Sequence, residues 1–151
     1  MDLKFKLAES SNLESIVRLL ADDPLGEKRE EFKTPLSNAY LTAFDNILND
    51  RNQELMIVTL GDEVIGTFQL SFIQYLTYQG GIRAQLEGVR VSENHRDKGI
   101  GAEILEFCIA RSKQKKAHLL QLTTDKERPE AIRFYESFGF VASHEGMKLH
   151  F

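Results

Sequence analysis

The sequence has only one cysteine, Cys108, so it cannot form an intramolecular disulfide bond. Its neighbours in a predicted helix are mostly apolar, which favours a small core residue over a reactive nucleophile. No stretch reaches the ~20 apolar residues that a membrane-spanning helix requires. Residues 1–10 lack the apolar run of a signal peptide. We therefore expect a cytoplasmic protein that does not insert into a membrane.

The sequence also lacks a strong excess of charge. It has 19 Lys and Arg residues against 23 Asp and Glu residues, a net charge of −4. This balance argues against a general affinity for nucleic acid or for anionic membranes. The 4 histidines show no metal-ligand spacing, so we expect no metal site. Apolar residues make up 42% of the chain, as in an ordinary globular protein, and the length predicts a single domain over residues 1–151.

The spacing of apolar residues changes along the chain and predicts an order of helices and strands. Helical spacing begins after a capping-box pattern at Ser11 and Glu14, and again after Thr34-Pro35. The charged segment Asp22–Lys33 between these two helices is predicted to be a mobile connection. The predicted strands are residues 3–7, 54–60, 64–72, 82–91, 119–123 and one or two within 140–151, and the later helices are residues 99–113 and 129–138.

This order predicts an α/β fold built on one mixed sheet. Three consecutive strands in the middle of the chain favour an antiparallel meander, whereas the later strand–helix–strand unit needs a parallel pair of neighbours. We therefore expect a mixed, mostly antiparallel sheet flanked by about four helices.

The third central strand, residues 82–91, changes its alternation halfway. Apolar residues and Gly88 occupy the even positions up to 88, and the odd positions are apolar at Val89 and Val91. One extra residue near Glu87-Gly88, a β-bulge, would restore the register, and glycine suits such a site. A strand buried on both faces would also explain the pattern. Because bulges recur beside active sites, this strand is a candidate part of a functional site.

A turn with two glycines, Arg96-Asp97-Lys98-Gly99-Ile100-Gly101, joins this strand to an amphipathic helix. Glycines allow a sharp turn and the close approach of a ligand, and amides that converge at a helix N-terminus suit a diphosphate. An ordinary helix start with surface charges would have the same residues. The turn is too short for a Walker A motif, and Ile104 stands where the dinucleotide fingerprint has its third glycine. A different nucleotide-bearing cofactor is indicated.

Together with a second motif, this turn resembles the GCN5-related N-acetyltransferase superfamily. The pyrophosphate motif of the superfamily, Gln/Arg-x-x-Gly-x-Gly/Ala, matches Arg96, Gly99 and Gly101. The second motif is a helix with an alanine and an aromatic–tyrosine pair before Gly-Phe, and it matches Ala131, Phe134-Tyr135 and Gly139-Phe140. The similarity extends from about Leu55 to the last residue, and residues 122–140 are similar to aminoalkylphosphonate acetyltransferases.

The resemblance implies an acyl-CoA N-acyltransferase fold with acetyl-CoA as the cosubstrate. The strand after the bulge would hold the pantetheine through its backbone, and the amides of the turn would hold the pyrophosphate. The superfamily often has asparagine three residues before the helix alanine, whereas this chain has Arg128 there, with Thr124 and Asp125 as candidate substitutes. The implied cofactor residues are Val89, Arg90, Val91, Arg96, Asp97, Lys98, Gly99, Ile100, Gly101, Ala102, Thr124, Asp125, Arg128, Ala131 and Phe134.

Glu87 and Tyr135 are the candidate catalytic residues. An alkyl amine has a pKa of about 10.4, as in lysine, so it must lose a proton before it attacks. Glu87 could accept that proton directly or through water. The resemblance implies that Tyr135 donates a proton to the departing CoA thiolate. The structural alternatives are an exposed strand glutamate and a core aromatic residue on a helix.

The expected function is direct transfer of an acetyl group from acetyl-CoA to a primary amine, most simply of a small molecule. Two alternatives remain open: a non-catalytic, acyl-CoA-binding regulatory domain, and a protein acetyltransferase that acts on lysine or an N-terminus. The segments Gln74–Gly81 and Asp22–Lys33 are candidate walls of the acceptor site, because loops on a rigid scaffold often determine specificity. A homodimer is common among similar proteins and is one expected state.

Overall fold

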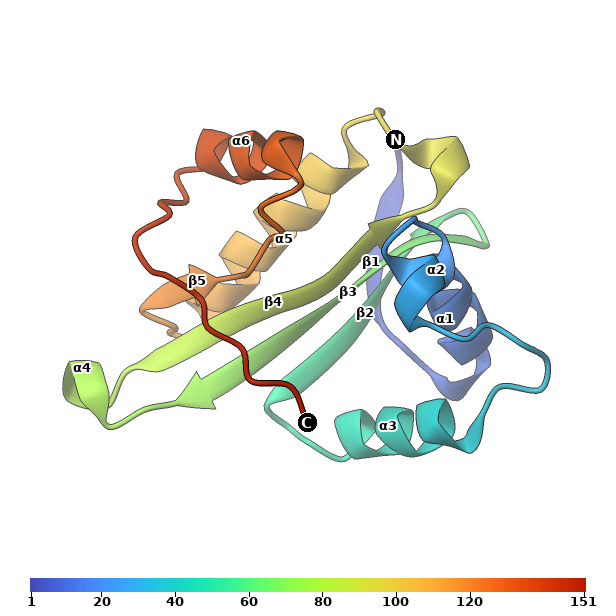
Figure 1. Cartoon of the computed structure of the whole chain (residues 1–151), viewed down its shortest axis with the longest axis horizontal. Helices are drawn as coiled ribbons and strands as arrows, with labels where there is room; N and C mark the ends of the chain where they lie inside the picture. The colour runs from blue at the N-terminus through green and yellow to red at the C-terminus, as the bar shows by residue number, and fades with distance from the viewer. The chain divides into compact units, whose positions relative to one another are not determined.

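The computed structural model describes all 151 residues, which divide into two compact units, Met1–Gln121 and Leu122–Phe151. Figure 1 shows the elements along the chain. The first unit contains β1 (Leu3–Leu7), the 3-10 turn η1 (Ser10–Asn12), α1 (Leu13–Ala21), α2 (Gly26–Arg29), α3 (Asn38–Leu48), β2 (Gln53–Leu60), β3 (Glu63–Gln74), α4 (Thr77–Gly80), β4 (Ile82–Val91), the 3-10 turn η2 (Glu93–His95), α5 (Ile100–Gln114) and β5 (Leu119–Gln121). The second unit contains α6 (Pro129–Ser137).

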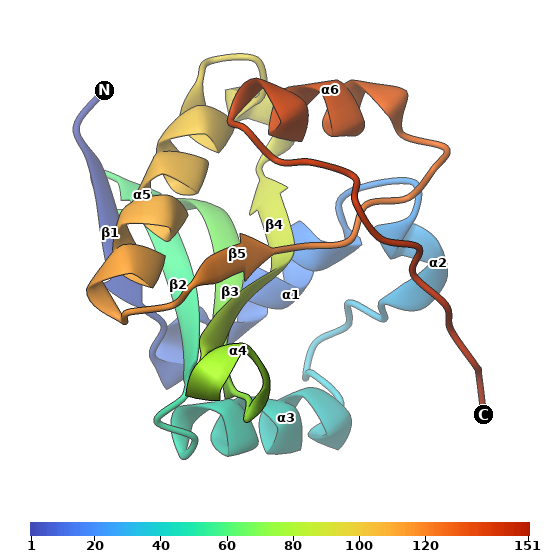
Figure 2. The same cartoon turned by 90° about the vertical axis from the view of Figure 1, so that its left-hand side faces the viewer.

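One five-stranded sheet in the order β1-β2-β3-β4-β5 forms the centre of the first unit. The pairs from β1 to β4 are antiparallel, and β5 is parallel to β4. This arrangement confirms the predicted mixed, mostly antiparallel sheet. The parallel pair is joined through α5, as a strand–helix–strand crossover requires. Figure 2 shows α5 on one face of the sheet and α1 on the other.

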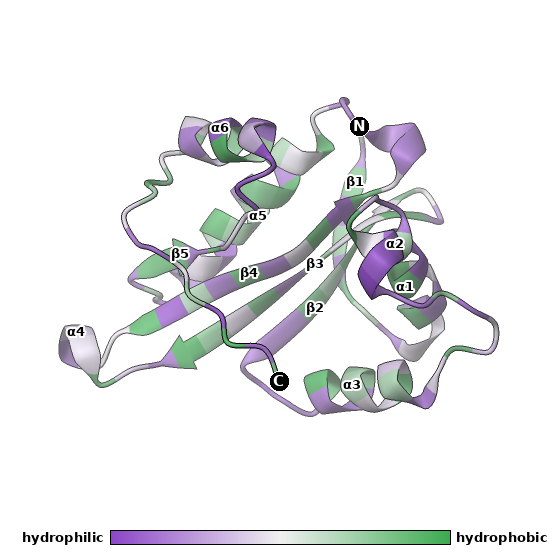
Figure 3. Ribbon diagram, viewed as in Figure 1, coloured by the Kyte–Doolittle hydropathy of each residue, from purple (hydrophilic) through white to green (hydrophobic).

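The face of the sheet beneath α5 is apolar. Phe68, Leu70 and Phe72 of β3 are all buried on this face, because successive side chains of a strand alternate between faces. Phe107 of α5 stacks on Phe5 of β1 with 4.7 Å between ring centroids, and it meets Phe68 edge-on at 5.8 Å. The green and purple bands along β4 in Figure 3 follow the same alternation.

Cys108 of α5 lies in this core, as expected, with none of its surface exposed. Burial raises the pKa of its thiol to about 12. Because the thiolate is the nucleophilic form, the residue is inert near neutral pH. The structure therefore supports a core role for Cys108.

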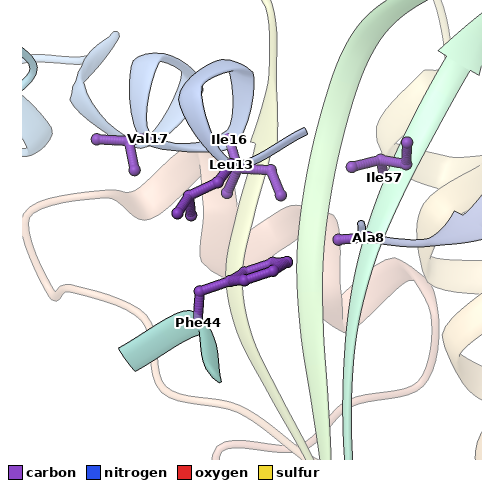
Figure 4. Close-up of a cluster of buried hydrophobic side chains, with 6 residues drawn as sticks. All are labelled: Ala8, Leu13, Ile16, Val17, Phe44 and Ile57. Atoms are coloured by element: carbon purple, nitrogen blue, oxygen red, sulfur yellow. The ribbon is translucent and has the colours of Figure 1, made fainter. Parts of the chain in front are cut away.

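A second apolar cluster covers the opposite face of the sheet at β2. Figure 4 shows its six residues, with the Phe44 ring of α3 beneath the side chains of α1. The cluster consists of Ala8, Leu13, Ile16, Val17, Phe44 and Ile57. Helical spacing places the α1 members on one side of that helix, as the periodicity predicts. The helix α3 packs against β2, whereas α1 packs against β3 and β4 and brings Leu20 next to Gly88.

A buried ion-pair network connects β2 to α5. The Glu54 carboxylate is only 9% exposed and accepts hydrogen bonds from Arg111 Nε at 2.9 Å and Nη2 at 2.6 Å. Lys115 Nζ lies 3.2 Å from Glu54 Oε1. The hydrogen bond from Arg111 outweighs desolvation and lowers the pKa of Glu54 below its ordinary value of 4.5.

Two helix starts differ from the prediction. The helix α1 follows Asn12, whose Oδ1 accepts the Glu9 N–H at 2.9 Å, so the capping box lies at η1, two residues earlier than Ser11 and Glu14 would place it. The helix α3 begins at Asn38 after an extended Ser37, and Thr34-Pro35 precedes it. More than one residue in each segment could cap a helix, and the tertiary contacts determine at which of them the helix begins.

The structure also contains two short helices that the prediction lacks. One of them, α2, lies within the segment 22–33 that was expected to be a mobile connection. The other, α4, follows β3, and Tyr78 and Gln79 within it have left-handed φ values of 52° and 58°. Each has four residues, too few to produce a periodic apolar pattern.

The helix α6 of the second unit ends at the predicted glycine. The Gly139 N–H donates to the Glu136 carbonyl at 2.9 Å, and the Phe140 N–H donates to the Tyr135 carbonyl at 3.2 Å. The Phe140 ring lies 5.8 Å from the Tyr135 ring. These bonds and the aromatic contact form a Schellman motif.

The prediction of one or two strands within residues 140–151 is wrong for this structure. These residues form no helix or strand, and residues 141–151 are all exposed. An isolated alternating segment has no hydrogen-bond partner for its backbone, so it does not form a strand without a neighbour. The preceding strand β5 is also two residues shorter than predicted and ends at Gln121.

We predict that Arg111→Met lowers the free energy of unfolding by about 2 kcal/mol, because it removes two hydrogen bonds to a buried carboxylate. Since the folded-state pKa of Glu54 is depressed, its contribution is complete above pH 4.5 and is lost as the pH falls through the folded value. Urea unfolding at pH 7 and at lower pH measures both effects. Arg133→Met, at an exposed position of α6, is the control. An equal loss in the two variants at pH 7 would contradict the role of the network.

Candidate functional site

A β-bulge in β4 lies at the centre of the candidate site. Thr67 of β3 is opposite Arg90, and Gln69 is opposite Glu87, so two steps along β3 correspond to three along β4. Gly88 occupies the interruption with a φ of +62°, a conformation that glycine adopts without a Cβ penalty. The structure therefore confirms the bulge predicted at Glu87-Gly88.

Beyond the bulge, the outer edge of β4 has no neighbouring strand. The parallel pairing with β5 ends at the pair Gln85 and Gln121, two residues before Glu87 in β4. The stretch Val89–Val91 is therefore paired with β3 on one side only. An extended ligand can add to such an edge through backbone hydrogen bonds.

Two arginine side chains occupy carbonyl groups of this stretch. Arg90 Nη1 donates to the Val89 carbonyl at 2.8 Å, and Arg96 Nε donates to the Val91 carbonyl at 3.1 Å. These contacts hold the end of β4 in position next to the glycine turn.

The glycine turn presents a run of backbone amides to solvent. Asp97 and Gly99 have φ values of +59° and +82°, and Gly99 is the N-cap of α5. No group of the chain accepts a hydrogen bond from the N–H groups of residues 97–101. The Ala102 N–H differs, because it donates to the Gly99 carbonyl at 3.0 Å. Convergent amides at a helix N-terminus form an anion site.

The cationic side chains of the turn donate hydrogen bonds to other groups of the chain. Arg96 Nη2 donates to the Asp22 carbonyl at 2.7 Å and lies 3.5 Å from the Asp22 carboxylate. Lys98 Nζ donates to the Asn94 carbonyl at 2.8 Å. Arg96 thus braces the turn against the segment after α1, a role that its motif position did not indicate.

A second ion pair attaches the same segment to β4. Arg90 Nε lies 3.0 Å from Asp23 Oδ2, and both side chains are largely buried. The other oxygen of Asp23 accepts the Gly26 N–H at the start of α2. The segment 22–33 is therefore fastened to both β4 and the glycine turn. Sequence reasoning missed this, because nothing in the spacing connects residues separated by about 70 positions.

Glu87 is exposed on the polar face of β4, and two glutamines form a ladder to it. Gln121 Nε2 of β5 donates to Gln85 Oε1 at 2.7 Å, and Gln85 Nε2 donates to Glu87 Oε1 at 2.9 Å. The side-chain oxygen of Gln85 accepts the hydrogen bond from Gln121, so the side-chain NH2 group of Gln85 is the group that faces Glu87. Sequence alternation shows that Gln85 and Glu87 share a face, but it does not identify Gln121.

The segment 74–81 packs its tyrosines on the far end of the same strand. The Arg83 guanidinium lies 4.3 Å from the Tyr75 ring centroid and 5.3 Å from that of Tyr78. Tyr78 also stacks on His118 at 4.8 Å. This segment therefore borders the polar face of β4 that carries Glu87, and its role as an acceptor-site wall stays a prediction.

The remaining predicted residues lie in the second unit. Phe134 and Tyr135 are adjacent on α6, with 5.4 Å between ring centroids and an edge-on arrangement. Arg128 is the N-cap of α6, and its carbonyl accepts the Ala131 N–H at 3.1 Å. Asp125 closes the preceding turn, because its carboxylate accepts the Glu127 N–H at 2.9 Å.

Other features of the chain offer no competing site. Two surface hollows of about 230 and 300 Å³ lie beside β1 and contain none of the predicted site residues. No group of three or more His, Cys, Asp or Glu residues could hold a metal ion. None of the helices has both the length and the apolar composition needed to cross a bilayer.

Comparison with known proteins identifies the class to which this geometry belongs. The model of the Acetyltransferase (GNAT) family matches residues 13–140, and the chain therefore belongs to this family. The match includes the bulged strand, the glycine turn and α6. No curated protein matches the chain by sequence.

Solved structures share the fold of this chain. A transcriptional regulator from Bacillus halodurans C-125 is 48% identical, with a TM-score of 0.95 and coverage of 99% of both chains. A predicted acetyltransferase with acetyl-CoA from Clostridium acetobutylicum is 20% identical, with a TM-score of 0.76 and coverage of 98% of this chain and 96% of that one. Glucosamine-6-phosphate N-acetyltransferase from Arabidopsis thaliana is 17% identical, with a TM-score of 0.79 and coverage of 100% and 99%.

We predict that Gly99→Ala weakens CoA binding by about tenfold, because a Cβ in the left-handed region disfavours the turn and would stand where the ligand approaches. Calorimetric titration with CoA measures this effect. Gly61→Ala is the matched control, since Gly61 also has a positive φ of +59° and open space at its Cβ position. Both variants should lose similar thermal stability. Equal CoA affinity in the two would contradict the assignment of the turn.

Proposed function

We propose that this protein is an N-acetyltransferase that moves the acetyl group of acetyl-CoA directly to a primary amine of a small molecule. Three features that lie close together in the chain carry the proposal. The strand β4 has an unpaired edge and the exposed carboxylate of Glu87, and the glycine turn after it has a run of amides without acceptors. Membership of the family supports acyl transfer in general. The acetyl donor and the small amine are the finer parts of the proposal.

The backbone of this chain fits the two polar parts of acetyl-CoA. The amides of residues 97–101 are available for the pyrophosphate. The edge of Val89–Val91, which no strand covers, would take the amide groups of pantetheine, and the arginine side chains on the Val89 and Val91 carbonyls would share or yield those positions. Bound in this way, acetyl-CoA would supply the acetyl group as a thioester. Thr124, Asp125 and Arg128 complete the proposed cofactor residues, together with the α6 residues Ala131 and Phe134.

Glu87 is proposed as the general base. A primary ammonium group must lose a proton to expose its lone pair, and an exposed carboxylate can accept that proton directly or through one water. The hydrogen bond from Gln85 fixes one carboxylate oxygen and leaves the other available. The amine nitrogen then forms the new C–N bond as the C–S bond breaks.

Tyr135 is proposed as the general acid. Its phenol would give a proton to the departing sulfur and would regain the second proton that the nitrogen loses on becoming an amide, while Glu87 would release the first proton to water. Cys108 is fully buried, with the pKa of its thiol raised to about 12, and so offers no nucleophile for an acyl-enzyme. Direct transfer needs no nucleophile on the protein. Much of the rate acceleration would come from holding the amine beside the thioester.

A second candidate function has one observation in its favour. The 48% identical structure is described as a transcriptional regulator, so a domain that binds acyl-CoA without turnover is a specific alternative. That alternative predicts thermal stabilisation by CoA and no acetylation of any amine. A protein acetyltransferase would acetylate peptides and leave small amines unchanged.

We predict that Glu87→Gln lowers kcat by about 10²- to 10⁴-fold and that Tyr135→Phe lowers it by at least about tenfold. The affinity for CoA should change little in either variant. The measurement is CoA release from acetyl-CoA over a panel of small amines and lysine peptides. Glu106→Gln, at an exposed position of α5, is the control. Unchanged turnover in both site variants would remove the assigned roles, and no turnover by the wild-type protein would favour the regulatory alternative.

We predict that Gln121→Glu lowers kcat by about tenfold, because a carboxylate at 121 accepts a hydrogen bond and turns the Gln85 amide oxygen towards Glu87. The KM for acetyl-CoA should stay within about twofold, since the ladder does not include the cofactor residues. Steady-state kinetics on the best amine of the panel separates the two constants. Gln114→Glu introduces the same charge at an exposed end of α5. Equal kcat values for these variants would show that the ladder does not orient Glu87.

A further inference from the structure

Arg83 of β4 is the one partly buried arginine of the chain that has no acidic partner. Arg90 is paired with Asp23 at 3.0 Å. Arg111 is paired with Glu54 at 2.6 Å. Arg83 forms no ion pair, and its Nε is buried without a hydrogen-bond partner. A polar group that is withdrawn from water without an acceptor costs free energy, so a ligand with an anionic group would stabilise this position.

Two tyrosine rings hold the Arg83 side chain and leave its hydrogen-bond donors unused. The guanidinium carbon lies 4.3 Å from the Tyr75 ring centroid and 5.3 Å from that of Tyr78. These cation–π contacts engage the charge of the group, and its N–H groups remain for an acceptor. Gln74 Nε2 donates to the Gly80 carbonyl at 2.8 Å and so fastens the segment of both rings, which lies at the end of the β3–β4 hairpin in Figure 1. The guanidinium is therefore positioned without a ligand.

Arg83 shares the polar face of β4 with Glu87, and no other charge lies on this face between them. The two residues are four positions apart in a strand with regular pairing, so their side chains point to the same side. The other residues on this part of the face of β3 and β4 are uncharged: Gln69, Ser71, Ile73 and Gln85. One positive and one negative charge on a neutral polar surface complement a ligand that has both an ammonium and an anionic group.

The spacing of the two residues sets the length of such a ligand. Four residues of a strand span about 13 Å. If each ligand group lies about 3 Å from its partner, the two ligand groups are separated by about 7 to 13 Å. With bonds of about 1.5 Å in a zigzag chain, this span corresponds to roughly six to ten bonds. An α-amino acid, in which two bonds separate the nitrogen from the carboxyl carbon, is too short to contact both Arg83 and Glu87.

We propose that the acceptor is a long zwitterionic amine whose anionic group binds Arg83 while its nitrogen lies at Glu87. This inference rests on the proposed acetyl transfer and specifies the acceptor of that reaction. The anionic group is a carboxylate or a phosphate, because a guanidinium binds either of them through paired N–H donors. Arg83 is then a specificity residue that binds the substrate at the end remote from the reacting nitrogen.

Steady-state kinetics with a matched pair of acceptors tests the role of Arg83. The pair is ω-aminooctanoate and the ω-amino alcohol of the same length, which lacks the anionic group. The wild-type kcat/KM should be at least about tenfold higher for the acid. Arg83→Met retains an unbranched side chain against the tyrosine rings but removes the charge, so the ratio should fall to about one. Arg51→Met removes an exposed charge elsewhere and should retain the wild-type ratio.

The ratio is measured within each variant, so a loss of folded protein affects both acceptors equally. A wild-type ratio near one, or an unchanged ratio in Arg83→Met, would overturn the proposal. Glycine tests the span and should be a poor acceptor; a kcat/KM equal to that of ω-aminooctanoate would also overturn it. The phosphate monoester of the amino alcohol identifies the anionic group, since the preferred ligand should have the larger loss in Arg83→Met.

Calorimetric titration of ω-aminooctanoate into the CoA-saturated protein separates this inference from the proposed function. If the protein acetylates no amine, the acetyl-transfer proposal fails. Binding of the acid that is lost in Arg83→Met and retained in Arg51→Met would then still support the anion site. Equal binding by the two variants, or no binding to the wild-type protein, would overturn it.

Discussion

The interruption of β4 at Gly88 is the constraint on which the candidate site depends. A strand without a bulge would alternate its side chains without interruption, and its outer edge could continue to pair with a strand beside it. The extra residue changes the parity between Glu87 and Val89 and increases the local twist. Pairing with β5 ends at Gln85, so no strand pairs with the outer edge of β4 after the bulge, where arginine side chains donate to the Val89 and Val91 carbonyls. One glycine with a positive φ thus separates the part of β4 that pairs with strands on both sides from the part proposed to face the cofactor.

The two faces of the sheet have different compositions and different roles. The face beneath α5 is filled by Phe68, Leu70 and other buried residues, and the Glu54 network fixes α5 over it. Because α5 begins in the glycine turn, this packing also positions the amides of that turn. On the opposite face, α3 packs against β2 and α1 packs against β3 and β4. The part of β4 before the bulge carries the glutamine ladder and the exposed Glu87 on this face, and the proposed chemistry would take place there.

Much of the fold follows from the sequence, and the exceptions have physical causes. Periodicity determines β1 to β4, α5 and α6, because each is long enough to show alternation or helical spacing. The bulge is visible because Val89 and Val91 have the wrong parity for an unbroken strand. The ion pairs of Asp22 and Asp23 with Arg96 and Arg90 are not visible, since they depend on how α1 returns to β4. The expected closing strands failed for a different reason: a strand needs a partner, and a sequence pattern cannot show that the chain lacks one.

The site residues differ in how strongly a sequence can identify them. The cofactor half is made mainly of backbone groups, and the sequence reveals such groups only through glycines that permit the required φ values. Arg96 illustrates the limit, because its motif position suggests a phosphate contact whereas its side chain holds the Val91 and Asp22 carbonyls. The acceptor half is made of side chains, so Glu87 is visible in the sequence but its orientation by Gln121 is not. A donor site built from backbone tolerates many side-chain changes. An acceptor site built from the side chains on the polar face of β4 would change with their substitution, so under the proposed function the specificity for the amine would arise there.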